Sequence, residues 1–112
     1  MVGRGLAAFE RHLAAERGLS PHTVRAYLGD ITALLEHAAE AGCTTLADLD
    51  IGVLRSWLAT QHGTGKARTT VARRAAAARA FTAFAHARGL LAADPGRLLG
   101  VPRTRRRLRG QR

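Results

Sequence analysis

Residues Lys66 to Arg88, KARTTVARRAAAARAFTAFAHAR, run without a glycine or a proline and predict one long helix that decides the fold of this chain. An α-helix turns by about 100° per residue, so apolar residues three and four apart gather on one side. On this stretch that side contains Val71, Ala75, Ala78, Phe81, Thr82 and Ala85. We therefore expect this side to pack against a core.

The opposite side of the same stretch carries only small residues between two basic edges. The small residues are Thr69, Ala72, Ala76, Ala80 and Ala83, with Arg68 and Arg79 along one edge and Lys66 and Arg73 along the other. Short side chains between cations allow close approach of a polyanion. An ordinary solvent-exposed helix also favours Ala and Arg, because both are good helix formers, and it explains this stretch equally well.

The composition around this helix predicts a single all-α domain. With 112 residues the chain suffices for one compact domain, and 46% hydrophobic but only 4% aromatic residues favour packed helices over a sheet sandwich. Cys43 is the single cysteine, so a disulfide within the chain is excluded and a reducing compartment is expected. Since the sequence has neither a signal peptide nor an apolar run long enough to span a bilayer, we expect a cytoplasmic protein.

The charge is strongly basic and unevenly distributed. The formal net charge is +10; the part up to Asp50 has four basic and seven acidic residues, whereas the part from Ile51 on has fourteen basic residues and Asp94. This balance predicts an acidic partner that binds mainly the second half of the chain. Nucleic acid is favoured over a membrane surface, because no stretch combines clustered cations with bulky apolar anchors.

Capping and stop residues divide the rest of the chain into helices. A first helix is expected from about Gly5 to Arg17, before Gly18. Ser20 and Pro21 start a second helix, which runs to about Ala41. The expected apolar face of that second helix consists of Val24, Tyr27, Leu28, Ile31, Leu34, Leu35 and Ala38.

The second half of the chain follows the same logic. Between Cys43 and Leu49 we expect a turn with a short helical piece, and Asp50 caps a third helix from Ile51 to about Gln61 that buries Trp57 with its Leu neighbours. After the fourth helix, about Arg68 to Arg88, the remaining apolar residues are expected to fold back or to add one short turn: Leu90 and Leu91 fold back, and Leu98, Leu99 and Val101 form the turn. Arg103 to Arg112 is expected to be a disordered basic tail.

The start of the second helix is a second candidate for anion binding. His22, Thr23 and Ala26 lie off its apolar face, at the end where the helix dipole and free N–H groups favour a phosphate. Helix capping explains Ser20 and Pro21 as well as phosphate binding does, and it is the favoured interpretation for those two residues.

The sequence offers no pattern for catalysis or for a metal. The five His residues show no i, i+4 pair and have no Cys at ligand spacing, so neither a metal nor a cofactor is expected. Tyr27 belongs to an apolar stripe, and we interpret it as a core residue with a polar tip. Gly65-Lys66 lacks the remaining residues of a phosphate-binding P-loop, which excludes an NTPase. We therefore expect a binding module rather than an enzyme, with no small-molecule substrate.

Several motifs in a fixed order resemble a known family. They are Leu19-Ser20-Pro21-His22-Thr23 with Tyr27 four residues on, Arg73-Arg74 leading to Ala78-Arg79-Ala80-Phe81, and Asp94-Pro95. Over about Phe9 to Arg107, the chain resembles the N-terminal core-binding domain of tyrosine recombinases, most closely the bacterial Xer-type enzymes. The resemblance implies a four- or five-helix, SAM-like bundle that forms one half of a clamp on double-stranded DNA, with the second and fourth helices facing the major groove.

The resemblance also implies which residues of the second and fourth helices contact DNA. The implied contact residues are Ser20, His22, Thr23, Ala26, Lys66, Arg68, Thr69, Arg73 and Arg79. It also implies a core-binding domain over residues 1–89, a linker and basic tail over 90–112, and further recombinase subunits as partners on the DNA. The family's catalytic Arg, Lys, His and Tyr residues belong to a separate C-terminal domain that this chain is expected to lack. The alternative is a helical protein-binding or RNA-binding module with a non-specific basic tail.

Overall fold

The computed structural model describes residues 2–99, which fold into four α-helices with short helical turns between and after them. The elements are α1 (Val2–Arg11), a π-helical extension (His12–Glu16), α2 (Pro21–Glu40), a 3-10 turn (Leu46–Asp48), α3 (Ile51–Gly63), α4 (Arg68–Ala87) and a 3-10 turn η3 (Pro95–Leu98). No strand occurs within residues 2–99. The expected all-α, four- to five-helix bundle is confirmed.

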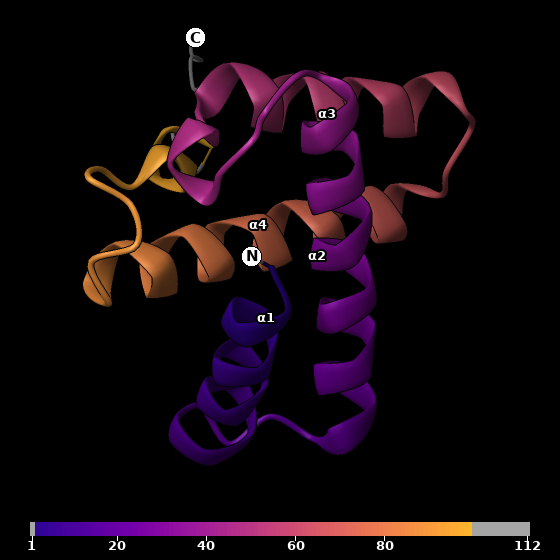
Figure 1. Ribbon diagram of the computed structural model, residues 1–112. Helices are drawn as coiled ribbons and strands as arrows, with labels where there is room; N and C mark the ends of the chain where they lie inside the picture. The colour runs from indigo at the N-terminus through magenta and orange to yellow at the C-terminus, as the bar shows by residue number, and fades with distance from the viewer. Residues whose placement is uncertain (1, 100–112) are drawn as a thin grey trace, which may run out of the picture.

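The four helices form two antiparallel pairs that cross each other (Figure 1). α1 and α2 run side by side in opposite directions, and α3 and α4 form the second pair, which lies across the upper half of α2. α2 contacts α1, α3 and α4, and the α2–α4 contact is the most extensive between any two α-helices. The arrangement therefore makes the crossing of α2 and α4 the centre of the bundle.

The helix ends follow the capping residues of the sequence. Ser20 Oγ accepts a hydrogen bond from the Thr23 N–H at 3.2 Å, and Asp50 Oδ1 accepts one from the Val53 N–H at 3.0 Å. Each bond satisfies an N–H group that the first turn of a helix leaves unpaired. Gly89, after α4, has a φ of 77°, a left-handed conformation that ends the helix without steric cost. The predicted starts of α2 and α3 and the end of α4 are confirmed.

The core is aliphatic with a few large aromatic anchors. Trp57 is 2% exposed, which confirms its expected place in the core. The fully or nearly fully buried apolar residues are Phe9, Leu13, Val24, Ile31, Leu34, Ala38, Leu49, Leu54, Trp57, Ala77, Ala78, Phe81, Phe84, Ala85 and Leu91. Phe9 of α1 packs edge-on against Phe81 of α4, with the ring centroids 5.2 Å apart. α1 therefore covers the core at the C-terminal half of α4.

The buried side of α4 is turned away from the one expected from the sequence. Ala77 and Phe84 are buried, whereas Val71 and Ala75 are only partly covered. Because α4 packs against α1 and α2 as well as α3, its buried arc is centred near Phe81 instead of Val71. Both Thr82 and Ala85 are buried as expected.

The first helix is longer than predicted and changes its winding. It begins at Val2 rather than about Gly5, and its last turn is π-helical, with the Arg17 N–H bonded to the His12 carbonyl at 3.0 Å. The wider turn lets the His12 ring pack at a tilt against Phe84, with ring centroids 4.9 Å apart, while Leu13 stays fully buried. Hydrophobic spacing alone does not reveal this change, because Phe9 and Leu13 keep helical spacing.

The segment after α4 folds back onto the bundle. Leu91 is buried as predicted, whereas Leu90 is 44% exposed, so its prediction is wrong: the turn after Gly89 directs only one of the two leucines inward. The η3 turn packs against α3 and α4, and of the three residues expected in a last turn, Val101 lies outside the described residues. The division of the chain at residue 89 stays a prediction.

Thr82 fixes this segment to α4. Its hydroxyl donates to Asp94 Oδ1 at 2.7 Å and accepts from the Gly96 N–H at 3.2 Å, and it is fully buried. A Cβ on Gly96 would overlap Thr82 Oγ1 and would lie 3.0 Å from the Arg79 Cα, so the backbone of η3 lies directly on α4. One hydroxyl therefore satisfies the two polar groups that hold the end of the described chain.

We expect Thr82→Val to lower the free energy of unfolding by about 1 to 3 kcal/mol, because it leaves a buried N–H without its acceptor while keeping the side-chain shape. Urea unfolding followed by circular dichroism measures the change. Thr32→Val is the matched control, since the Thr32 hydroxyl is exposed and bonds only the Leu28 carbonyl of its own helix. Equal stability of the two variants would show that the hydroxyl of Thr82 does not hold η3.

Candidate nucleic-acid interface

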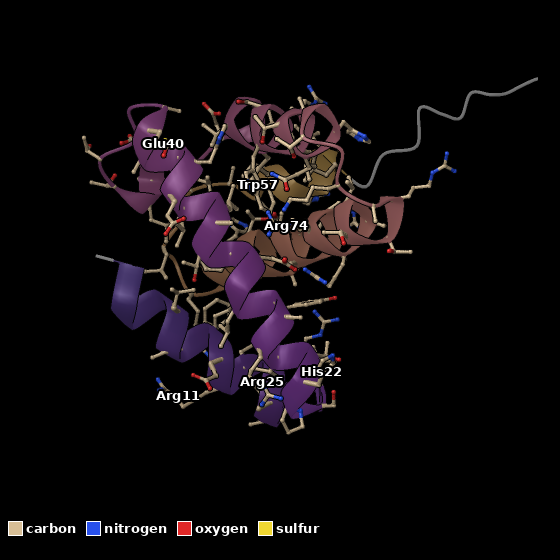
Figure 2. All side chains as sticks on the ribbon, turned by 90° about the vertical axis from the view of Figure 1, so that its right-hand side faces the viewer. Arg11, His22, Arg25, Glu40, Trp57 and Arg74 are labelled. Carbon is tan, nitrogen blue, oxygen red and sulfur yellow. The ribbon has the colours of Figure 1, made fainter. Side chains whose placement is uncertain are left out.

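The start of α2 presents a mixture of free and internally bonded side chains. His22 is exposed, whereas Thr23 and Ala26 are half-buried. Ser20 Oγ accepts from the Thr23 N–H and donates to Thr23 Oγ1 at 3.1 Å, so the capping interpretation of Ser20 is confirmed. Figure 2 shows His22 and Arg25 together at the lower end of α2.

Arg25 is a basic residue at this end of α2 that was not predicted as a contact residue from the sequence. It is exposed and follows His22 by three residues, so it lies almost one helical turn further along the same side. The signal that could have found it is this spacing. It adds a full positive charge to a helix end that already favours anions.

The alanine-lined side of α4 is open to solvent. Arg68, Thr69, Ala72, Arg79 and Ala83 are all exposed. Ala76 and Ala80, on the same side, are half-buried. The expected strip of short side chains with Arg68 and Arg79 beside it therefore exists at the surface.

The second basic edge of that strip is not formed as expected. Lys66 lies in the turn before α4 and lines an open hollow of about 310 Å³ together with Glu36 and Glu40. Lys66 therefore lies apart from the strip, in a hollow that these acidic side chains also line. Arg73 turns toward α2 instead of extending along the strip, because a buried carboxylate of that helix binds it.

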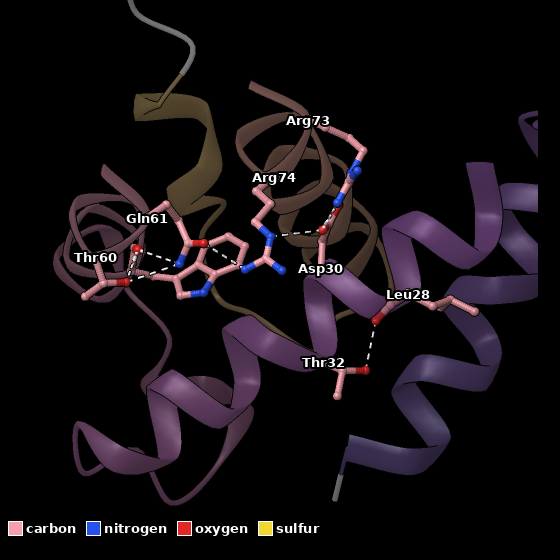
Figure 3. Close-up of polar contacts among 8 residues, drawn as sticks. Leu28, Asp30, Thr32, Thr60, Gln61, Arg73 and Arg74 are labelled. Atoms are coloured by element: carbon pink, nitrogen blue, oxygen red, sulfur yellow. Dashed lines mark hydrogen bonds and ion pairs between the residues drawn. The ribbon is translucent and has the colours of Figure 1, made fainter. Parts of the chain in front are cut away.

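The carboxylate is Asp30, which is only 1% exposed and is shared by two arginines (Figure 3). Arg73 donates from Nε to Oδ2 at 2.8 Å and from Nη2 to Oδ1 at 2.6 Å, and Arg74 donates from Nε to Oδ1 at 3.1 Å. A buried carboxylate is tolerated only when paired and hydrogen-bonded. Both oxygens of Asp30 are therefore satisfied by α4, and the pair fixes the crossing of α2 and α4.

Arg74 extends the network to α3. Its Nη1 donates to Gln61 Oε1 at 2.9 Å, and its guanidinium lies over the ring of Trp57, 5.5 Å from the centroid. The Gln61 amide in turn donates to the Trp57 carbonyl at 3.2 Å. Three helices thus meet at Asp30, Arg74 and Gln61, near the crossing seen in Figure 2.

The two arginines differ in exposure. The Arg73 side chain is 40% exposed, whereas that of Arg74 is 18% exposed. The hydrogen bonds that Arg73 donates to Asp30 also raise the pKa of Arg73 above its usual value, so Arg73 stays charged throughout the accessible pH range. Arg73 is therefore a paired cation that still reaches the surface, and Arg74 is an internal one.

The buried ion pair of Asp30 was not predicted from the sequence. Asp30 follows Tyr27 by three residues and precedes Leu34 by four, which places a carboxylate within the apolar face of α2. The sequence signal for a buried ion pair is a single acidic residue in such a face, in a chain that also contains two adjacent arginines, Arg73 and Arg74.

The described part of the chain offers a surface rather than an enclosed site. Among residues 2–99 there is no group of three or more His, Cys, Asp or Glu side chains that could hold a metal ion. The same residues include no helix that is both long and apolar enough to cross a membrane. A hollow of about 440 Å³ between α3, α4 and η3 is lined mostly by aliphatic residues, together with Arg55 and His62.

Comparison with known proteins agrees with this architecture. Residues 6–89 match the family described as "Phage integrase, N-terminal SAM-like domain". The chain is 55% identical over 103 residues to the tyrosine recombinase XerC of Mycobacterium leprae (strain TN), which covers 92% of this chain and 34% of that protein. It is 52% identical to the XerC of Mycobacterium tuberculosis (strain ATCC 25177 / H37Ra) and 49% identical to that of Mycobacterium sp. (strain KMS), with the same 92% of this chain covered.

The chain spans about a third of the length of the curated relatives it matches. No solved structure matches it. These relatives carry the name tyrosine recombinase as whole proteins, and the match covers their part that corresponds to the bundle described above.

We expect Arg74→Ala to destabilise the bundle more than Arg73→Ala, by about 3 against about 1 kcal/mol. Arg74 is less exposed and also binds Gln61 and covers Trp57, whereas the interaction of Arg73 is partly screened by water. Thermal and urea unfolding of the two variants measure the difference. An equal or reversed order would show that Asp30 relies on Arg73 as its main partner.

Proposed function

The chain belongs to the phage integrase N-terminal SAM-like domain family, and from this membership we propose that it binds double-stranded DNA as the N-terminal clamp domain of a Xer-type tyrosine recombinase. One structural observation supports the proposal most directly. The exposed side of α4 carries Arg68, Thr69 and Arg79 on a strip of short side chains. Such a surface admits the sugar-phosphate backbone closely and neutralises its charge.

The proposed contact surface draws on both crossing helices. From α2 and its cap it includes Ser20, His22, Thr23 and Ala26, and we add the exposed Arg25. From α4 and the preceding turn it includes Lys66, Arg68, Thr69, Arg73 and Arg79. We expect most of these groups to contact phosphates, which sets affinity and register, and some to contact base edges in the major groove, which sets sequence preference.

In this proposal the chain positions DNA and does not cut it. Within the family the residues that cleave and rejoin strands belong to a separate catalytic domain, and Tyr27, half-buried against the core, does not correspond to the nucleophile. The bundle of residues 1–89 would be the clamp domain, residues 90–112 the linker and basic tail, and further recombinase subunits would join it on the same DNA. Such a role would place the protein in the cytoplasm with its DNA.

We expect duplex binding that weakens steeply with salt. If about five phosphates are neutralised, the slope of log affinity against log salt concentration is roughly −4 to −5, because each contact releases condensed counterions. Fluorescence anisotropy of a short labelled duplex over a range of KCl concentrations measures the slope. Binding that is insensitive to salt, or absent at low salt, would contradict the proposed function.

We expect Arg68→Ala and Arg79→Ala to weaken this binding by about fivefold each, as expected for the loss of one phosphate contact of roughly 1 kcal/mol. Arg88→Ala is the matched control, because Arg88 caps the C-terminal end of α4, where it lies over Phe84 and 3.6 Å from Glu16. Equal losses in all three variants would indicate that only net charge matters and that α4 has no defined contact face.

The alternative function, a helical protein-binding or RNA-binding module with a basic tail, is tested by deleting Arg103 to Arg112. These residues lie outside the described part of the chain. If the bundle is the DNA-binding unit, the shortened protein retains duplex binding and the sensitivity to Arg68→Ala. Complete loss of binding on deletion would favour the alternative.

A further inference from the structure

Asp30 of α2 occupies only one of the two hydrogen-bonding edges of the Arg73 guanidinium. A guanidinium has five N–H donors, with one pairing edge formed by Nε and Nη2 and a second formed by the two Nη atoms. Asp30 occupies the first edge with both of its oxygens, at 2.8 and 2.6 Å. Within residues 2–99 no hydrogen bond engages Nη1 of Arg73.

Arg74 is the second cation that binds Asp30, and it differs from Arg73 in how it is held. Its contacts with Gln61 and Trp57 hold it inside the bundle. The three charged groups together carry one net positive charge. Since Arg74 is the more buried of the two, the excess positive charge is presented at the surface by Arg73, 40% of whose side chain is exposed.

We propose that Asp30 is a positioning residue for DNA binding: it holds Arg73 by the Nε/Nη2 edge so that the Nη1/Nη2 edge is presented to a backbone phosphate at the crossing of α2 and α4. This inference rests on the proposed function and specifies how one of its contacts is built. A phosphate offers two oxygens that match the free edge of a guanidinium. Because Asp30 fixes the long side chain before DNA arrives, less rotamer freedom is lost on binding.

The positioning role predicts an effect opposite in sign to simple electrostatics. Asp30→Asn removes a negative charge, and so does Glu36→Gln on the exposed side of the same helix. Net charge alone would make both variants bind DNA more tightly. We expect Glu36→Gln to bind slightly more tightly and Asp30→Asn to bind about fivefold more weakly, because Arg73 loses its orienting partner.

A second comparison separates positioning from a purely structural role. Arg73→Gln is expected to reduce the magnitude of the salt slope by about one, since one phosphate contact disappears. Arg74→Gln is its matched control: it removes the same charge and a hydrogen bond to the same carboxylate, yet it should leave the slope unchanged while lowering stability at least as much. All variants are measured below their thermal transitions, which circular dichroism establishes for each.

The outcomes distinguish this inference from the proposed function. If the unmodified chain binds duplex DNA but Asp30→Asn binds as tightly as Glu36→Gln, or if Arg73→Gln keeps the full salt slope, the positioning role is overturned and the DNA-binding function stands. If Asp30→Asn does not fold, the comparison of Arg73→Gln with Arg74→Gln decides. Failure of the unmodified chain to bind duplex DNA overturns both.

Discussion

The buried carboxylate of Asp30 is the constraint around which this bundle is organised. A charge that is 1% exposed is tolerated only with close, well-oriented partners, and α4 provides them as Arg73 and Arg74. Apolar packing alone permits helices to slide and rotate against each other, whereas hydrogen bonds to both carboxylate oxygens fix one crossing. Through Gln61 and Trp57 the same network reaches α3, so one ionic centre sets the relation of three helices.

The orientation of α4 then decides which residues meet the solvent. With Arg73 and Arg74 directed at α2 and with Phe81 and Phe84 in the core, the remaining arc of the helix carries Arg68, Thr69, Ala72, Arg79 and Ala83. Its side chains are short except for the arginines, which reach beyond them. The contact that holds the fold together thus also produces the surface for which we propose DNA binding, and Arg73 belongs to both.

Much of this architecture could be predicted from the sequence because it depends on local chemistry. The caps at Ser20 and Asp50 and the stop at Gly89 act within one turn of the chain, and the apolar spacing of Phe9, Leu13 and Trp57 marks core positions in any helical packing. The family match agrees with the fold inferred in this way. The π-helical turn at His12 and the outward position of Leu90 could not be predicted, because they depend on what the neighbouring helices leave room for.

The sequence by itself determined the capped starts of α2 and α3, the end of α4, the all-α class, the excess of positive charge in the second half of the chain and the family. Only the tertiary structure decided which cations are free. Lys66, Arg68, Arg73 and Arg79 are equivalent charges in the sequence, yet the structure separates them. Lys66 lines the same hollow as Glu36 and Glu40, Arg68 and Arg79 lie exposed on the α4 strip, and Arg73 is bound to a buried carboxylate. The physical reason is that a charge takes its role from partners within a few ångströms, and Asp30 and Arg73, far apart along the chain, become partners only when α2 and α4 cross.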